Sequence, residues 1–454
     1  MALDWHRKTA LELGAAIGAG AIDPVELAGF FLERIATRDT DHLVYLRLTP
    51  ERARAEAEAA RARAKAGRRL SALDGVPLSW KDLVDSAGVE TSGAARALRG
   101  RVPEHDAPLL ARATRAGTVC LGKTNLTEFA FSGLGINTTY GTPPNACDDK
   151  VARIPGGSSS GAAVSVARGL AAAAIGSDTG GSVRIPAALN GLVGLKTTAG
   201  SLPMDGILPL SPSLDTIGPL TRDVADANAL WSVLRGRPGA DLAGTTLKGK
   251  RLLAVENSLF ENVDPGVDRA VREGLGKLER AGARVTWATV EEIDRAVGIM
   301  GRGGGLVTTE AYACWGDLIE EKPDEIFRFM LPRFRIGLTS TGVDIVRMLR
   351  ELAQVQAAMH RKLAGFDAMV APTVPISAPP IDDLIDDETA YTRANRGTLR
   401  NTTPGNLLKL CALTLPCGTD DLGLPAGLML MQRPDQEAAL LRLGKAVETA
   451  LATA

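Results

Sequence analysis

The chain has 454 residues, a formal net charge of -1 and 45% hydrophobic residues, which is typical of a soluble globular protein with a sizeable core. This charge indicates no general affinity for nucleic acid or acidic membranes, and no apolar run has the length of a transmembrane helix. The charged N-terminal residues lack the apolar region of a signal peptide, so we expect a cytoplasmic protein. Five scattered cysteines without a CxxC pair favour reduced thiols over disulfides or a zinc site.

The first third of the chain predicts helices. Thr9 to Glu12 has the pattern of a capping box, and Asp23-Pro24 has that of a cap followed by a first-turn proline. Two helices are therefore expected within residues 10–37. A third helix, rich in alanine, arginine and glutamate, is expected from Thr49 to about residue 66.

An alternation of strand, turn and helix begins at residues 74–82, where a turn and a short strand end at Lys81. Lysine is usually a surface residue, but the run Pro77-Leu-Ser-Trp80 suits an interior strand. Asp106 is expected to cap a helix ending at Gly117. Further strands are predicted at 118–122, 171–175, 192–196, 251–255, 284–288, 369–371, 414–415 and 428–430. Further helices are predicted after 125, at 221–234, at 265–281, through most of 290–365 and from 435. A long loop is predicted at 202–219. This alternation argues for an α/β protein with a parallel or mixed sheet.

The stretch from Arg153 to Arg184 contains two glycine-rich turns that carry serines. The first, GGSSSG at residues 156–161, opens a predicted helix whose small residues form a thin face for close packing. The second, SDTGGS at residues 177–182, follows an apolar strand. Its two glycines can hold several amides pointing in one direction, as a developing oxyanion requires.

Several kinds of chemistry could use these turns. Phosphate binding is disfavoured, because neither a Gly-Lys-Ser/Thr nor a GxGxxG sequence occurs there. Residues 157–161 satisfy GxSxG, the nucleophile elbow of α/β-hydrolases, with Ser159 as nucleophile. Of the four histidines, only His360 lies downstream, in a helical pattern, and the residues before the turn make a poor strand. A serine nucleophile then needs another base, and Lys81 is the best placed, because burial favours the neutral amine.

Five ordered segments resemble the amidase signature family. They are Gly75-Val-Pro-Leu-Ser-Trp-Lys-Asp-Leu83, Gly122-Lys-Thr-Asn125, Pro155-Gly-Gly-Ser-Ser-Ser-Gly161, Gly176-Ser-Asp-Thr-Gly-Gly-Ser182 and Ser213-Leu-Asp-Thr-Ile-Gly-Pro219. The likeness is strong over about residues 5–235 and weaker beyond, and five blocks in order far exceed a chance match. It implies one large α/β domain over residues 1–454, with a twisted mixed sheet covered on both faces by helices. Its parts are an N-terminal helical segment (1–70), a catalytic core (71–235) and the remaining sheet with substrate-side helices (236–454).

The resemblance implies a Ser-Ser-Lys triad with Ser182 as nucleophile, Ser158 as bridge and Lys81 as base. The peptide bond between Gly157 and Ser158 is cis in the family. Amides of Thr179, Gly180, Gly181 and Ser182 would line an oxyanion hole, and Ser132 would lie beside the substrate. From the residues themselves, Asp178 and Arg184 are expected to form an ion pair that supports the second turn. Ser159 and Ser160 are expected to be hydrogen-bond donors within the first turn.

The implied activity is hydrolysis of a linear carboxamide through an acyl-enzyme, without a metal or cofactor. The expected partner is a small-molecule amide, not nucleic acid or a membrane, and a homodimer is left open. The main alternative is the A subunit of the tRNA-dependent amidotransferase, which passes ammonia from glutamine to a partner subunit. Relatives of this A-type protein are expected to have a longer C-terminal part, which favours a free-standing enzyme. A non-catalytic amide-binding protein is disfavoured, because all three triad positions are filled.

Overall fold

The computed structural model describes residues 4–453, and in this part of the chain eleven strands form one mixed sheet. The strands are β1 (Tyr45–Leu48), β2 (Pro77–Lys81), β3 (Val119–Thr124), β4 (Ala173–Ser177), β5 (Val193–Lys196), β6 (Ile217–Thr221), β7 (Arg251–Val255), β8 (Arg284–Ala288), β9 (Ala368–Pro372), β10 (Cys411–Thr419) and β11 (Pro425–Gln432). Their order is β1-β3-β2-β4-β6-β5-β10-β11-β9-β7-β8. Parallel pairing occurs in β3-β2-β4 and in β9-β7-β8. The predicted α/β class with a mixed sheet is confirmed.

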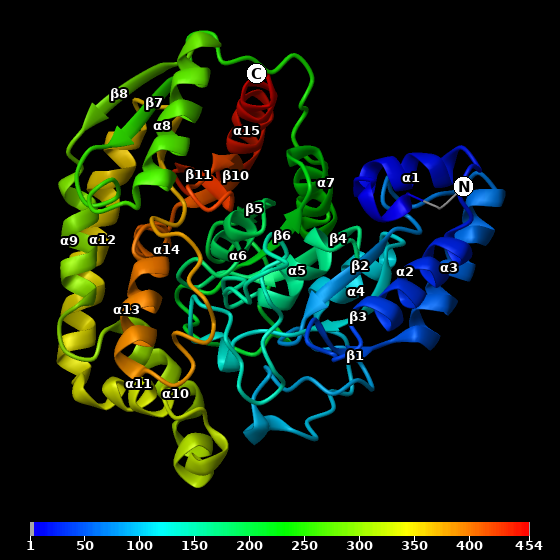
Figure 1. Cartoon of the computed structure of the whole chain (residues 1–454), viewed down its shortest axis with the longest axis horizontal. Coiled ribbons are helices and arrows are strands. Elements are labelled where there is room, and N and C mark those ends of the chain that lie inside the picture. The colour runs from blue at the N-terminus through cyan, green and yellow to red at the C-terminus, as the bar shows by residue number, and fades with distance from the viewer. Residues whose placement is uncertain (1–3, 454) are drawn as a thin grey trace.

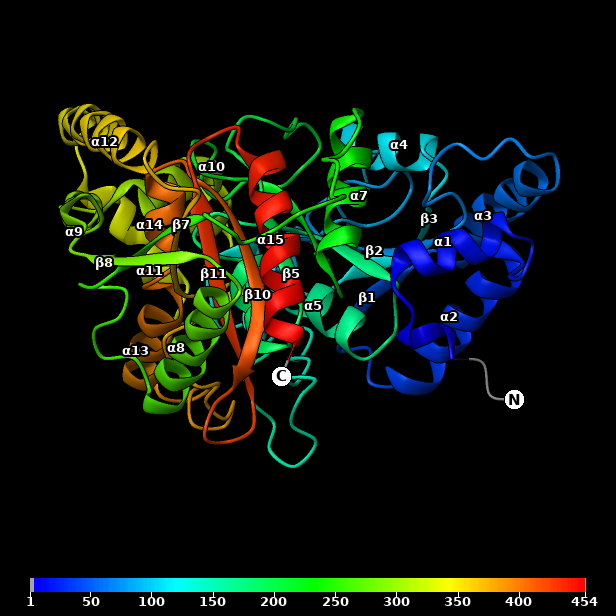
Figure 2. The same ribbon diagram turned by 90° about the horizontal axis from the view of Figure 1, so that it is seen from above.

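Helices cover this sheet along its whole length (Figure 1). They are α1 (Ala10–Gly18), α2 (Pro24–Arg38), α3 (Pro50–Lys65), α4 (Pro108–Arg115), α5 (Ser160–Ala167), α6 (Arg184–Leu189), α7 (Val224–Arg235), α8 (Pro265–Arg280), α9 (Glu291–Met300), α10 (Leu306–Glu321), α11 (Leu331–Ile336), α12 (Gly342–Leu363), α13 (Glu388–Leu399), α14 (Thr403–Leu407) and α15 (Glu437–Ala452). Both views place α1 to α3 at one end of the molecule and α9 with α12 at the other (Figure 2). No helix among the described residues is long and apolar enough to cross a membrane.

Strand β5 shows that the sheet is covered on both faces. Val193 and Leu195 belong to an apolar core that includes Val224 of α7. Gly194 faces the other way, because a Cβ built there would lie 2.7 Å from the Cβ of Ala187 in α6. Successive strand residues point to opposite faces, so α6 and α7 lie on opposite sides of the sheet.

Helix α5 has the thin face that its small residues predict. Ala162, Ala163 and Val166 are fully buried in a small core, and α5 packs against β2 and β4. A Cβ at Gly161 would lie 2.6 Å from the carbonyl oxygen of Val44 and 2.7 Å from the amide nitrogen of Asn125. Only glycine lets α5 begin this close to the neighbouring main chain. The packing therefore holds the GGSSSG turn near the end of β2.

Two predicted helix starts are wrong. Asp106 does not cap α4, because both of its carboxylate oxygens accept hydrogen bonds from Arg52, each at 2.8 Å. The helix expected after Asn125 is only the short 3-10 turn Glu128–Ala130, in which Phe129 has a φ of 51°. A positive φ at a phenylalanine interrupts a helix.

Strands β1 and β6 are not among the predicted elements. The expected loop at residues 202–219 ends in β6, where Ile217 and Pro219 pair with β4 in an antiparallel register. Glycine and proline within β6 weaken the strand signal. Strand β1 is short, lies at the edge of the sheet and pairs with β3 through an irregular register.

Candidate active site

Lys81 is the last residue of β2, which runs parallel between β3 and β4. Its side chain is fully buried. The Nζ atom donates hydrogen bonds to Ser158 Oγ at 2.7 Å and to Ser177 Oγ at 2.8 Å. The structure thus places Lys81 in the interior, bonded to one of the two serines that the resemblance pairs with it.

Ser158 lies in the first turn, immediately before α5, and its hydroxyl group is buried. The peptide bond between Gly157 and Ser158 is cis. The amide of Thr127 donates to the Ser158 carbonyl at 3.1 Å, and the amide of Ser159 donates to the Ser182 carbonyl at 3.3 Å. The second of these bonds joins the two serine-bearing turns, and the first ties the Ser158 turn to the segment after β3.

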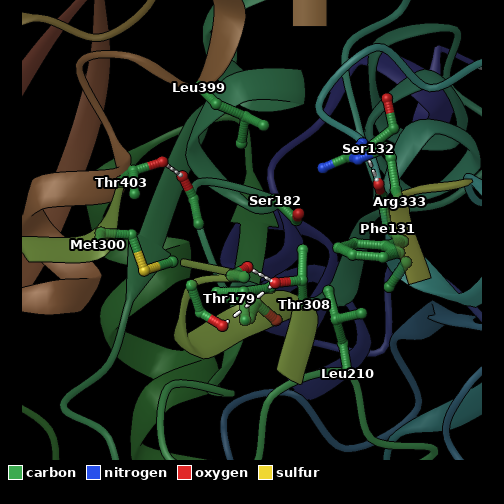
Figure 3. A pocket seen from close by; sticks show the side chains of 15 residues that line it. Phe131, Ser132, Thr179, Ser182, Leu210, Met300, Thr308, Arg333, Leu399 and Thr403 are labelled. Carbon is green, nitrogen blue, oxygen red and sulfur yellow. Dashed lines mark hydrogen bonds between the residues drawn. The ribbon is translucent and has the colours of Figure 1, made fainter. Parts of the chain in front are cut away.

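Ser182 stands in the turn between β4 and α6 and lines a cavity (Figure 3). Gly181 has a φ of 141°, and a Cβ there would clash with Thr402 Oγ1, so the turn requires glycine. Among residues 4–453, none accepts a hydrogen bond from the main-chain N–H groups of Thr179, Gly180, Gly181 and Ser182. These N–H groups remain available to a negatively charged oxygen of a ligand.

The protein interior changes the acid–base chemistry of Lys81. Burial lowers the pKa of Lys81 to about 7, because the interior disfavours the ammonium form, while the charges of Asp178 and Asp215 act to raise it. Near neutral pH a large fraction of Lys81 is therefore the free amine. A free amine at this position can accept a proton from the Ser158 hydroxyl.

Asp178 and Arg184 flank the Ser182 turn and form a fully buried ion pair. Arg184 Nε lies 3.0 Å from Asp178 Oδ2, and Nη2 lies 3.0 Å from Oδ1. Asn406 bonds to both, with its Nδ2 donating to Asp178 Oδ1 at 2.9 Å and its Oδ1 accepting from Arg184 Nη2 at 2.6 Å. Burial alone would raise the pKa of Asp178, but the Arg184 charge holds it below its usual range. Asp178 therefore stays ionised and orients the turn.

Replacing Arg184 by methionine is expected to lower the free energy of unfolding by about 3–5 kcal/mol, because Asp178 would remain buried without its counter-charge. The exposed pair of Arg335 and Glu320 offers a matched control. Arg335→Met should leave the urea midpoint nearly unchanged, since exposed pairs contribute little. Urea denaturation of both variants measures the difference, and equal midpoint shifts would contradict a structural role for the buried pair.

The cavity in front of Ser182 has a volume of about 210 Å³. Its wall combines apolar side chains (Phe131, Leu210, Met300, Val307 and Leu399) with polar ones (Ser132, Thr179, Ser182, Thr308, Arg333 and Thr403). Ser132 Oγ is bonded to Asn395 Oδ1 at 2.9 Å, which orients it at the rim of this wall. The structure therefore brings Ser132, Thr179, Gly180 and Ser182 to one cavity, while Lys81 and Ser158 are not part of its lining.

Ser177 is a candidate that the sequence analysis does not assign a role. It ends β4 as Lys81 ends β2, and neighbouring parallel strands bring their carboxyl ends to one edge of a sheet. The common position of Ser177 and Lys81 at strand ends could have pointed to Ser177 from the sequence. In the structure the two side chains are joined by the hydrogen bond from Lys81 Nζ to Ser177 Oγ. In the described part of the chain, no group of three or more His, Cys, Asp or Glu side chains could hold a metal ion.

The geometry gives no support to the elbow hypothesis. Ser159 is fully buried, and its Oγ donates to the Ser177 carbonyl at 3.2 Å. His360 lies in α12 and contacts the Leu408 carbonyl through Nε2 at 3.0 Å. No strand leads directly into the turn, although an elbow needs a strand, a sharp turn and a helix in sequence.

Comparison with known proteins identifies the family. Residues 26–441 match the family model described as Amidase. The chain is 37% identical to the 2-amino-5-chloromuconic acid deaminase of Comamonas testosteroni, over 87% of this chain and 86% of that protein. It is 32% identical to the A subunit of the glutamyl-tRNA(Gln) amidotransferase of Chloroflexus aggregans, over 98% of this chain and 96% of that protein.

The alignment with the A subunit covers 96% of the Chloroflexus aggregans protein. The expectation that such A subunits have a longer C-terminal part is therefore wrong for this relative, and length does not distinguish the two proteins. Among solved structures, a crystal structure of an amidase superposes with a TM-score of 0.87 at 30% identity, covering 97% of this chain and 99% of that one. The chain therefore belongs to the amidase signature family, whose members are hydrolases that act on carbon–nitrogen bonds.

Proposed function

We propose that this amidase-family hydrolase cleaves linear carboxamides through an acyl-enzyme on Ser182, with Ser158 as the bridge and Lys81 as the base. The observation that carries this proposal is the state of Lys81. It is a fully buried amine with a pKa of about 7, and its Nζ lies 2.7 Å from Ser158 Oγ. A buried lysine beside a serine is one of the known replacements for the histidine of a serine hydrolase.

The reaction begins when the neutral amine of Lys81 accepts the proton of Ser158, which in turn takes the proton of Ser182. The Ser182 oxygen then attacks the amide carbonyl, and the negative oxygen of the tetrahedral intermediate accepts hydrogen bonds from the free N–H groups of residues 179–182. Return of a proton through Ser158 lets the amine or ammonia leave. Water, deprotonated through the same two groups, attacks the acyl-enzyme, and Ser182 recovers its proton as the carboxylic acid is released.

We expect kcat/KM to fall about tenfold per pH unit on the acid side of a single step whose apparent pKa lies near 7. Only the neutral form of Lys81 accepts a proton, and burial depresses its pKa, so activity is present above this value and lost below it. Initial rates between about pH 5 and pH 9 measure the step. A profile that is flat across this range would contradict a role for Lys81 as base.

The second candidate is a glutamine-hydrolysing A subunit of an amidotransferase. The relative from Chloroflexus aggregans, with 98% of this chain aligned, favours it. The relative from Comamonas testosteroni is a deaminase, a name that also describes release of ammonia from a carbon–nitrogen bond. We place the free-standing amidase first, because the relative with the higher identity, 37% against 32%, is named as a deaminase and not as a subunit of an amidotransferase.

The test is a screen of primary and substituted amides for release of ammonia or amine, with Ser182→Ala as the negative control. Hydrolysis by the isolated chain that disappears in this variant supports the amidase. Turnover of glutamine that requires partner proteins and a charged tRNA would favour the amidotransferase role. Tight binding of amides without any turnover would replace both with a non-catalytic binding protein.

A further inference from the structure

Arg333 is the one charged side chain in the wall of the cavity, among its described lining residues. It belongs to α11, far from the serine turns in the sequence. Figure 3 shows it beside Phe131 and Ser132, with its guanidinium group directed into the cavity. The same cavity holds Ser182 and contains no acidic lining residue among those described.

The guanidinium group is held in one orientation. Its Nη1 donates to the Phe131 carbonyl at 2.6 Å, and its central carbon lies 4.4 Å from the centre of the Phe131 ring. Phe334, on the same helix, packs against the Phe129 and Phe131 rings at 5.5 and 4.9 Å. These contacts hold α11 in place. The N–H groups of Arg333 other than the one bonded to Phe131 have no acceptor among the described residues.

The charge of Arg333 is not balanced by the protein. Two other arginines close to it in the sequence have carboxylate partners, since Arg328 pairs with Asp386 and Arg335 pairs with Glu320. Arg333 forms no ion pair within residues 4–453, and burial together with the charge of Arg396 lowers its pKa. Arg333 is partly buried, and a partly buried cation without a counter-ion is costly. A planar guanidinium binds a carboxylate through two parallel hydrogen bonds.

We propose that the cavity binds amides whose acyl part carries a carboxylate, and that Arg333 binds this carboxylate while the carboxamide lies at Ser182. This inference rests on the proposed function and names the substrate class of the same site. The volume of about 210 Å³ is below the ~300–1,000 Å³ of common ligand pockets, so the acyl chain is short. The apolar side chains of Leu210, Met300 and Val307 would contact the carbons between the two ends. Monoamides of short dicarboxylic acids have this form.

The test compares glutaramic acid with pentanamide, which has the same chain length but no carboxylate. Wild-type enzyme should prefer the acid, and Arg333→Gln should lower the ratio of the two kcat/KM values by at least about 100-fold, mainly through KM for the acid. Arg333→Lys should restore part of the preference, because it keeps the charge but loses the paired geometry. Arg335→Gln, an exposed control on the same helix, should leave the ratio unchanged.

A binding measurement separates this inference from the proposed function. Calorimetry with Ser182→Ala should show binding of glutaramic acid but not of pentanamide, and the added change Arg333→Gln should abolish it. Equal binding of both compounds, or equal loss of both kcat/KM values in Arg333→Gln, would overturn the role of Arg333. If the acid binds through Arg333 but neither compound is hydrolysed, with Ser182→Ala matching wild type, the proposed function fails and the inference stands.

Discussion

Replacing Ser182 by alanine is expected to lower kcat by about 10⁵- to 10⁶-fold, which is the loss seen when a serine hydrolase loses its nucleophile. The proposal makes the Ser182 oxygen the atom that attacks the carbonyl, and alanine offers no substitute. The fold should be unaffected, because the Ser182 hydroxyl makes no hydrogen bond to a described side chain or main-chain group. Single-turnover kinetics on the best amide from the screen measures the loss, and thermal unfolding verifies the fold.

Ser159→Ala is the matched comparison, since Ser159 is the nucleophile of the elbow hypothesis. Its hydroxyl only bonds the Ser177 main chain, so we expect its loss to change kcat by about tenfold or less. If instead Ser159→Ala abolished activity while Ser182→Ala retained it, the assignment of the nucleophile would be wrong.

Replacing Lys81 by methionine is expected to lower kcat/KM by about 10³- to 10⁴-fold, because the Ser158 and Ser182 hydroxyls would lose their proton acceptor. Methionine has a similar length and suits the buried position without the cost of a charge. The acid step in the pH profile should disappear together with the activity. Stopped-flow or long-duration assays across pH measure both effects.

Lys196→Met is the control for the loss of a buried lysine in general. Lys196 is also fully buried, burial lowers its pKa to about 8, and it bonds only the Thr197 and Leu410 carbonyls. The Lys196→Met change should lower the stability of the fold but leave the acid step in the pH profile in place. A Lys81 variant with wild-type kcat/KM, or one that keeps the acid step near pH 7, would contradict the role of Lys81.

The sequence predicts the local conformation around the candidate residues well where the signal is local. The run before Lys81 suits an interior strand, and the glycines around Ser158 and Ser182 predict tight turns, so each candidate lies in a segment whose conformation its own residues specify. The small residues of α5 likewise predict its close packing. These are short-range preferences, which do not depend on what packs against them.

The features of the fold and the site that the sequence does not predict depend on contacts between distant segments. Arg333 enters the cavity because Phe334 packs on Phe129 and Phe131, about two hundred positions earlier in the chain, and no local pattern reveals that contact. Asp106 has the pattern of a cap but pairs with Arg52, because a guanidinium partner outcompetes a cap bond. Strand β6 contains glycine and proline, and its pairing with β4 overrides its weak propensity.

The central claim concerns which oxygen carries the acyl group, and peptide mapping tests it directly. Trypsin cleaves after Arg153, Arg168 and Arg184, so Ser158 to Ser160 and Ser182 fall into separate peptides, 154–168 and 169–184. Wild-type enzyme is quenched with acid during turnover of the best amide, digested and analysed by mass spectrometry. The account predicts the added mass of the acyl group in peptide 169–184, localised to Ser182 by fragmentation. The same mass in peptide 154–168, on Ser159, would contradict it.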